Sequence, residues 1–238
     1  MKKPLNRPKI KDFPIFSTKL PSPWGNTDTK KILKILKKNN IHVTFFMTGG
    51  WIESYPEDVK AIYEGGHELG NHSENHKQMS KLSAEECKEE LMKPHEKVKK
   101  LTGVDMKVFR PPYGDYNNTL VKTAEECGYH TIQWDVDSLD WKDYGVDSII
   151  NTVLNHKHLG NGSIILCHNG AKYTAKALDT LIKGLKEKGY EFVTMSELIY
   201  EDNYKLDGEG RQHSLSQESE QSTTAPKQES PENSDAAS

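Results

Sequence analysis

The sequence lacks the features that mark several large classes of protein. It has no apolar run as long as a membrane span, and none follows the basic start Met1–Lys3, so we expect neither a transmembrane segment nor a signal peptide. The net charge of -3 argues against nucleic acid as the main partner. Three widely spaced cysteines, Cys87, Cys127 and Cys167, predict neither a disulfide framework nor a paired-cysteine zinc site. We expect them to be free thiols in the core.

An acidic residue is also missing where the chemistry of the chain requires one. Segment 71–76 reads Asn-His-Ser-Glu-Asn-His and carries two histidines that would suit half of a divalent-metal site built for hydrolysis. Segment 19–25, upstream, reads Lys-Leu-Pro-Ser-Pro-Trp-Gly and contains no carboxylate. Two imidazoles hold a metal weakly, and a metal-bound water still needs a base. Hydrolytic activity therefore depends on what precedes Trp24.

Composition divides the 238 residues into three parts. Residues 1–23 are basic and rich in proline, so we expect an irregular segment in which 14–17 form at most a short edge strand. Residues 24–201 alternate between helical and strand patterns and predict one domain. Residues 202–238 contain almost nothing to bury, which predicts a disordered tail.

The alternation in the central part predicts an α/β fold with a parallel sheet and helices outside it. Six or seven strand–helix units in one domain favour a distorted (β/α) barrel over an open doubly wound sheet. The expected strands are residues 41–47, 67–71, 107–109, 129–134, 163–167 and 191–194.

Local signals predict several helix ends. Asp28 is placed to cap a helix that ends at 39–40, and Ser83 with Glu86 predicts a capping box for another. Pro94 lies inside that second helical pattern, so we expect a kink or a break there.

The polar clusters follow predicted strands, at the end where parallel barrels place their sites. Each cluster, taken alone, also has a structural explanation that involves no function. The spacing of His72 and His76 is weak by itself, and neutral imidazoles suit zinc, cobalt, nickel or iron equally well. Segment 110–114, Arg-Pro-Pro-Tyr-Gly, is either a stiff turn or a loop that orients a carboxylate and aims a backbone N–H at an oxyanion.

Two further clusters leave similar alternatives. Segment 137–141, Asp-Ser-Leu-Asp-Trp, is either an exposed polar loop or the wall of an apolar pocket beside an acid. His168, at the end of a strand, is either a core histidine bonded to backbone or a general acid whose tautomer a nearby acid fixes.

Together these motifs resemble the NodB-homology polysaccharide deacetylases of carbohydrate esterase family four. The matching motifs are His-Ser-x-x-His at 72–76, Arg-Pro-Pro-Tyr at 110–113, Asp-Ser-x-Asp-Trp at 137–141 and Leu-x-His at 166–168. Segments 24–29, 133–137 and 196–200 look like the sporulation-type (PdaB-like) branch of spore-forming Firmicutes. The resemblance covers about residues 24–211.

The resemblance implies a site and a reaction. His72 and His76 would bind a divalent metal, usually zinc, with cobalt or nickel as alternatives, and His168 would be the general acid. The other implied roles are Asp140 tuning His168, Arg110 orienting the base, Tyr113 supplying the oxyanion N–H, and Trp141 with Leu166 holding the acetyl methyl group. The implied substrate is an N-acetylated glycan such as peptidoglycan. Family members are usually exported or associated with the cell envelope.

The first motif departs from the family. Members carry Phe-Asp-Asp-Gly, and this branch tends to carry Phe-Asp-Ala-Ala-Trp-Gly, where this chain has Leu-Pro-Ser-Pro-Trp-Gly at 20–25. The nearest acids, Asp12 and Asp28, do not align with the base. Two explanations stay open: a degenerate deacetylase that keeps the fold and binds glycan or metal without turnover, or a reading frame interrupted just before Trp24. An unbroken Phe-Asp-x-x-Trp-Gly in a neighbouring frame of the DNA would support the second.

Overall fold

The computed structural model describes residues 15–18 and 25–215. The predicted first motif at 20–24, most of the N-terminal segment and the tail from 216 onward lie outside the described residues. Contacts divide the chain into two units, Met1–Leu198 and Ile199–Ser238. Within the described ranges, none of the helices combines the length and apolar character needed to cross a bilayer.

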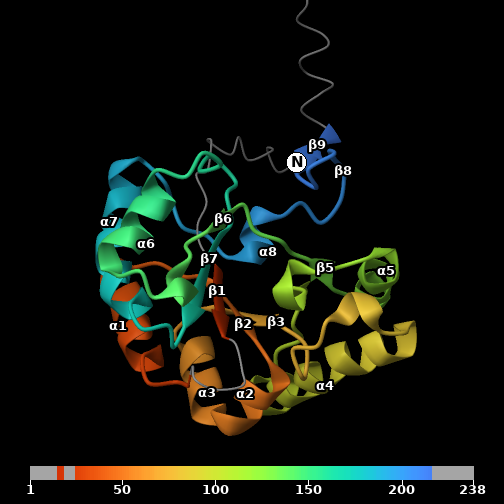
Figure 1. Ribbon diagram of the computed structural model, residues 1–238. Helices are drawn as coiled ribbons and strands as arrows, with labels where there is room; N and C mark the ends of the chain where they lie inside the picture. Colours follow the sequence, from red (N-terminus) through yellow and green to blue (C-terminus); the bar gives the residue numbers. More distant parts are fainter. Residues whose placement is uncertain (1–14, 19–24, 216–238) are drawn as a thin grey trace, which may run out of the picture. The chain divides into compact units, whose positions relative to one another are not determined.

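A seven-stranded parallel sheet forms the centre of the larger unit (Figure 1). Its order is β5-β4-β3-β2-β1-β7-β6, and the described residues contain no β5–β6 pairing that would close the barrel. The parallel sheet with outer helices confirms the predicted α/β fold, and β5 and β6, which do not pair with each other within the described residues, are where the (β/α) barrel is distorted. The strands are β1 (Ile15–Thr18), β2 (Thr44–Met47), β3 (Glu68–Asn71), β4 (Val108–Phe109), β5 (His130–Thr131), β6 (Val136–Asp137) and β7 (Ile165–Asn169).

Strand β1 occupies the middle of the sheet, so the expectation of an edge strand near 14–17 is wrong. It pairs with β2 on one side and β7 on the other, which places Ser17 beside both Phe46 and His168. Residues 15–18 contain no proline, so every residue of β1 has an N–H to donate, as a central strand requires.

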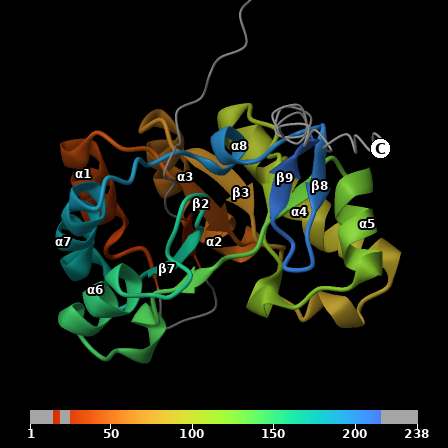
Figure 2. The same cartoon turned by 90° about the horizontal axis from the view of Figure 1, so that it is seen from above.

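The helices surround the sheet in two groups (Figures 1 and 2). Helix α7 packs against α1 and α6, whereas α4 packs against α2, α3 and α5. The helices are α1 (Thr29–Asn39), α2 (Gly49–Ser54), α3 (Pro56–Glu64), α4 (Ala84–Thr102), α5 (Asn118–Glu126), α6 (Val146–Leu154), α7 (Thr174–Glu187) and α8 (Met195–Leu198), with short 3₁₀ turns η1 (Met79–Lys81), η2 (Pro112–Gly114) and η3 (Asp140–Lys142).

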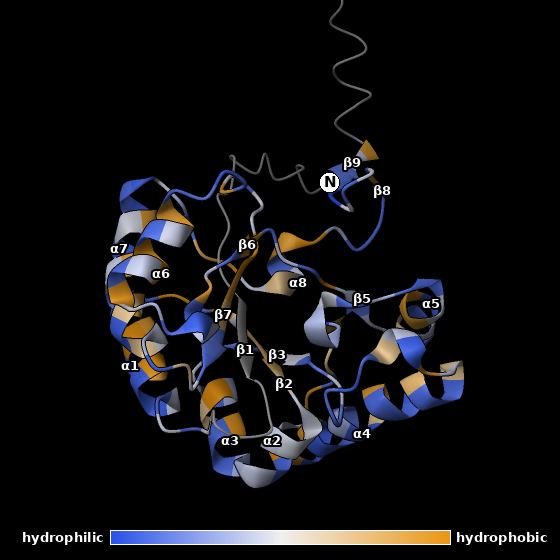
Figure 3. Cartoon of the chain, in the orientation of Figure 1, coloured by the Kyte–Doolittle hydropathy of each residue, from blue (hydrophilic) through white to orange (hydrophobic). Residues whose placement is uncertain are grey.

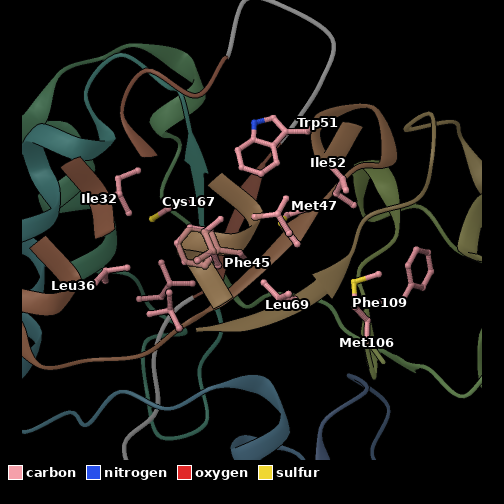
Figure 4. Packing of buried hydrophobic residues seen from close by; sticks show 14 of the residues in the cluster. Ile32, Leu36, Phe45, Met47, Trp51, Ile52, Leu69, Met106, Phe109 and Cys167 are labelled. Carbon is pink, nitrogen blue, oxygen red and sulfur yellow. The ribbon is translucent and has the colours of Figure 1, made fainter. Parts of the chain in front are cut away.

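The core lies between the sheet and these helices. Ile32 and Leu36, which share one face of α1, are fully buried together with Phe45 of β2 (Figure 4). Figure 3 shows hydrophobic residues on the central strands and hydrophilic residues over much of the outer surface of α4. Cys87 and Cys167 are buried free thiols, as expected for small core residues.

Helix α4 begins as expected but is not broken at Pro94. The Ser83 hydroxyl accepts from the Glu86 N–H and the Glu86 carboxylate accepts from the Ser83 N–H, which makes a complete capping box. Pro94 has no N–H for the carbonyl four residues earlier. That carbonyl, of Glu90, instead accepts from the Glu74 N–H at 2.9 Å. A loop thus satisfies the oxygen that the proline leaves unpaired, and the predicted break is wrong.

Three other expectations differ from the structure. Residues 191–194 form no strand, because the Thr194 N–H and hydroxyl both donate to the Glu197 carboxylate at the start of α8. The strand expected at 129–134 is limited to β5, and β6 is a further short strand that was not predicted. In the smaller unit, β8 (Tyr204–Leu206) and β9 (Gln212–Ser214) form an antiparallel hairpin, so the prediction of disorder from 202 onward is wrong for these residues.

Replacing Gly70 by alanine should destabilise the sheet. A Cβ at Gly70 would lie 2.8 Å from the ring of Phe46, which is fully buried and has little room to move. We expect Gly70→Ala to lower the free energy of unfolding by about 1–3 kcal/mol, measured by urea denaturation. The control is Gly160→Ala, because the nearest atom to its new Cβ is 4.0 Å away. Equal stability of the two variants would contradict this packing constraint.

Candidate active site

A pocket of about 270 Å³ opens at the C-terminal ends of the parallel strands. It brings together all the predicted site residues except Asp140, which is buried behind His168. The lining residues are His72, His76, Arg110, Pro111, Tyr113, Trp134, Asp137, Trp141, Leu166 and His168. They come from the segments that follow β3, β4, β5 and β6 and from strands β6 and β7 themselves, which converge at one edge of a parallel sheet.

The two histidines of the 72–76 segment lie against each other in this pocket. Their ring centroids are 4.8 Å apart and the ring planes are nearly perpendicular, at 82°. Nδ1 of His72 lies 2.6 Å from the carbonyl oxygen of Arg110, which can only accept, so Nδ1 carries the hydrogen. Burial, with the nearby Arg110 charge, lowers the pKa of His72 well below its usual value. His72 is therefore a neutral imidazole with Nε2 as its electron-pair donor.

These donors fit a metal only in part. Neutral imidazole is a good ligand for zinc, cobalt or nickel, and a carbonyl behind Nδ1 is a common support for a metal-binding histidine. A catalytic zinc site usually has three protein ligands, however. No group of three histidine, cysteine, aspartate or glutamate side chains in residues 15–18 and 25–215 is placed to hold a metal. The described residues thus supply only two donors of the usual set of three.

Arg110 is a buried cation for which residues 15–18 and 25–215 provide no anionic partner. Its side chain is 1% exposed, and the guanidinium lies 4.9 Å from the centre of the Phe46 ring and 6.0 Å from that of Trp134. Its Nη1 atom has no hydrogen-bond partner. Burial lowers the pKa of Arg110 to about 9. Burying a charge without a partner is costly, so this guanidinium is typical of one arranged around a carboxylate that the described residues do not provide.

Asp140 holds His168 from behind the pocket. The Asp140 side chain is fully buried, and its Oδ1 lies 2.6 Å from Nδ1 of His168. Its Oδ2 accepts from the backbone N–H of His168 and from the Thr174 hydroxyl, both at 2.6 Å. Because a carboxylate only accepts, Nδ1 of His168 is protonated, and Nε2 is the ring atom that would exchange a proton with a substrate. Thr174, which no sequence motif identifies, is the first residue of α7 and joins that helix to this pair.

Asp137 is the only carboxylate that lines the pocket in the described part of the chain. Its oxygens accept from the Leu139 N–H at 2.9 Å and from the indole N–H of Trp141 at 3.3 Å, so it orients the Trp141 wall. Trp134 forms another wall. Neither Trp134 nor Asp137 was assigned to the site from the sequence, although both lie within segments that resemble the family. Leu166 is 5% exposed, whereas Trp141 is 44% exposed at the rim.

Asp28 neither caps α1 nor replaces the missing acid. It stands at the N-cap position but makes no side-chain capping bond, so the predicted cap is wrong. Its carboxylate instead accepts from the Gly170 N–H at 2.8 and 3.0 Å, just beyond His168. Burial raises the pKa of Asp28 above its usual value. Asp28 is not among the residues that line the pocket, and Asp12 lies outside the described residues.

Comparison with known proteins identifies a family for this chain. Residues 19–132 match the sequence model of the family described as polysaccharide deacetylase. A peptidoglycan-N-acetylglucosamine deacetylase of Bacillus cereus is 37% identical over 73% of this chain and 82% of its own length. The Bacillus subtilis peptidoglycan-N-acetylmuramic acid deacetylase PdaA is 33% identical over 77% of this chain and 70% of its own length. An uncharacterised Geobacillus stearothermophilus protein is 40% identical, and this chain spans 68% of its length. The chain spans only 59% of the Bacillus subtilis protein YlxY, which is 37% identical.

Solved structures include relatives with and without activity. The crystal structure of a pseudoenzyme of carbohydrate esterase family four from Bacillus anthracis has a TM-score of 0.74 and 34% identity, covering 80% of this chain and 66% of that one. A mutant of that pseudoenzyme, described as having restored enzymatic activity, has the same TM-score and identity and covers 80% and 68% of the two chains.

Replacing Asp140 by asparagine should disrupt the hydrogen bonds between residue 140 and His168 and so destabilise the fold. The asparagine would bring an NH₂ donor among three donors that Asp140 now accepts from, leaving at least one buried donor unpaired. We expect Asp140→Asn to lower the free energy of unfolding by about 2–4 kcal/mol in urea denaturation. The matched control is Asp143→Asn, which changes an exposed carboxylate of the same loop and should alter stability by less than about 0.5 kcal/mol. A loss no larger than that of the control would contradict the assigned bonds.

Proposed function

The chain belongs to the polysaccharide deacetylase family, and we propose that its pocket is a peptidoglycan N-deacetylase site that lacks the general base. The observation that carries the proposal is Arg110, a buried guanidinium whose Nη1 has no partner, in a pocket that also contains the predicted metal ligands and general acid. The chain as it stands would therefore bind an N-acetylated glycan without efficient turnover. The glycan is proposed from the relatives, several of which are named peptidoglycan deacetylases.

The proposed division of labour follows from the contacts. Cleaving an acetamide requires a polarised carbonyl and a protonated leaving nitrogen. His168, with Nδ1 bonded to Asp140, would donate the proton from Nε2. The backbone N–H of Tyr113, which has a left-handed φ of 62°, would face the developing oxyanion. Trp141 and Leu166 would enclose the acetyl methyl group.

The proposed metal ligands are His72 and His76. The acid that this chain lacks in the first motif would be the third protein ligand. Family enzymes are typically metal-dependent, and zinc is the metal we propose, with cobalt or nickel as alternatives. The chemistry that a divalent metal supplies in a hydrolase is polarisation of the carbonyl and a lower pKa of bound water.

The register of β1 supports an acid shortly after this strand. Ser17 lies beside His168 in the sheet, so the C-terminal end of β1 is at the same edge as the pocket. The family's Phe-Asp aligns with Leu20 and Pro21, two and three residues after β1 ends. The restored activity of the Bacillus anthracis pseudoenzyme mutant supports the idea that a scaffold of this family can regain catalysis by substitution.

Restoring the acid should create activity. We expect the unchanged chain to release no acetate from N-acetylglucosamine oligomers with added zinc or cobalt, and the double variant Leu20→Phe/Pro21→Asp to release it with turnover at least about 100-fold above background. Adding His168→Ala to that variant should remove the gain. Turnover by the unchanged chain would show that another group, such as Asp137, serves as base.

The same restored acid should tighten metal binding. By calorimetric titration we expect zinc to bind the unchanged chain weakly and the Leu20→Phe/Pro21→Asp variant at least about 10-fold more tightly, because a third ligand completes the set. His72→Ala should abolish binding in both backgrounds. Binding that is unaffected by His72→Ala would place the metal elsewhere.

A non-catalytic barrel that binds glycan or metal is the second candidate, favoured by a pseudoenzyme among the structural relatives. Binding of N-acetylglucosamine oligomers without turnover, in both the unchanged and the restored chain, would favour it. Assignment to the sporulation-type branch rests on segments such as 24–29 and stays a prediction. Peptidoglycan as substrate implies an exported or envelope-associated protein, which is likewise a prediction.

A further inference from the structure

We propose that helix α4 and Tyr129 position the histidine loop, residues 72–76, through two hydrogen-bonded anchors that lie outside the pocket. One anchor holds Asn71, immediately before the loop, and the other holds Glu74 and Asn75 within it. The role as positioning device for metal ligands rests on the proposed function of His72 and His76. The anchors themselves are contacts of described residues and can be tested without a metal.

The histidine loop needs external support because its backbone is strained. Ser73 and His76 both have left-handed φ angles, of 67° and 54°, which non-glycine residues adopt only at a cost in free energy. Such conformations persist when surrounding contacts fix them. Relaxation of either residue would rotate one imidazole relative to the other.

The first anchor is Asn71, the fully buried last residue of β3. Its side-chain oxygen accepts from the Ser73 N–H at 2.9 Å, which directs the chain into the left-handed turn. The Ser73 hydroxyl in turn accepts from the His76 N–H at 2.9 Å. The Asn71 amide donates to the Leu91 carbonyl of α4 at 2.7 Å and to the Tyr129 hydroxyl at 2.8 Å. Asn71 therefore connects both strained residues to α4 and Tyr129.

The hydrogen bonds beyond Tyr129 have one consistent direction. The Asp105 carboxylate can only accept, so Nε2 of His95 carries the hydrogen of their 3.0 Å contact. In the neutral ring Nδ1 then accepts from the Tyr129 hydroxyl at 2.6 Å, while the Tyr129 oxygen accepts from Asn71. Burial raises the pKa of Tyr129, so the hydroxyl keeps its proton. The Tyr129 hydroxyl thus joins the side chain of Asn71 to that of His95.

The second anchor is the Glu90 turn of α4. Its carbonyl, left without a helical donor by Pro94, accepts from the Glu74 N–H at 2.9 Å. Its carboxylate accepts from the backbone and side-chain amides of Asn75, both at 2.8 Å. The proline inside α4 thus turns a helix carbonyl into a contact for the histidine loop.

Tyr129→Phe tests the first anchor, with Ser163→Ala as the matched control. The control removes a buried hydroxyl that bonds His158 and Gly160, at the opposite end of β7 from the pocket. In Tyr129→Phe we expect amide hydrogen exchange of Ser73 and His76 to be at least about 10-fold faster than in the unchanged chain, and zinc affinity in calorimetry to fall several-fold. In the control, exchange at Ser73 and His76 should not change. Unchanged exchange at both amides in Tyr129→Phe would overturn this anchor.

Two variants of His95 separate positioning from general packing. In His95→Asn the side-chain oxygen, attached to Cγ as Nδ1 is, can still accept from the Tyr129 hydroxyl, so exchange at Ser73 should stay near that of the unchanged chain. In His95→Leu no acceptor remains, and exchange should accelerate. Equal behaviour of the two variants would show that His95 contributes only bulk.

Pro94→Ala tests the second anchor, because alanine supplies an N–H that competes with Glu74 for the Glu90 carbonyl. Exchange of the Glu74 amide should accelerate although the helix regains its regular bond, and no acceleration would overturn this anchor.

Zinc that fails to bind even the unchanged chain would contradict the ligand role of His72 and His76, while the exchange results would still decide whether α4 positions the loop.

Discussion

The site depends on one constraint of parallel sheets: all strands end at the same edge, so their polar loops converge where little water is available to satisfy them. Each buried polar group there must find a partner from another loop. Asp140 meets this requirement by accepting three hydrogen bonds, from His168 and Thr174. Asn71 meets it by using both amide hydrogens and its oxygen. These bonds fix the orientation of the pocket side chains and join β3, β7, α4 and α7.

Arg110 departs from this rule, and the departure has a chemical meaning. Its guanidinium lies against Phe46 and Trp134, and within the described residues its Nη1 atom has no hydrogen-bond partner. Side-chain oxygens of Glu74 and Asn169 also lack one, but Arg110 is the cation of this group. A fold that had lost its function entirely would gain stability by replacing such a residue with an apolar one. The retained guanidinium fits a polysaccharide deacetylase scaffold that is intact except for the acid that Arg110 would face. Similarity to both deacetylases and a pseudoenzyme agrees with this view.

Irregular features of the structure recur around the histidines. Three features break a local preference: Pro94 within α4, the left-handed backbone of Ser73 and His76, and the buried hydrogen bonds that link Asn71 through Tyr129 to His95. In each case a residue from a distant segment supplies a compensating contact. Departures from local rules are expected at functional sites, because fixing a side chain in a set position requires conformations that the chain alone would not choose.

The sequence by itself determined the parts that depend on neighbouring residues. Apolar periodicity predicted most helices and strands, the Ser83–Glu86 pair predicted the capping box, and the motifs predicted every pocket side chain except Pro111, Trp134 and Asp137. Only the tertiary structure decided where Asp28 and the Glu90 carbonyl find their partners and that β1 is central. Asp28 and Gly170 are 142 residues apart, and no local pattern records such a pair. The physical reason is that propensity acts over one or two turns of chain, whereas a buried polar group bonds to whatever partner the packed sheet brings within reach.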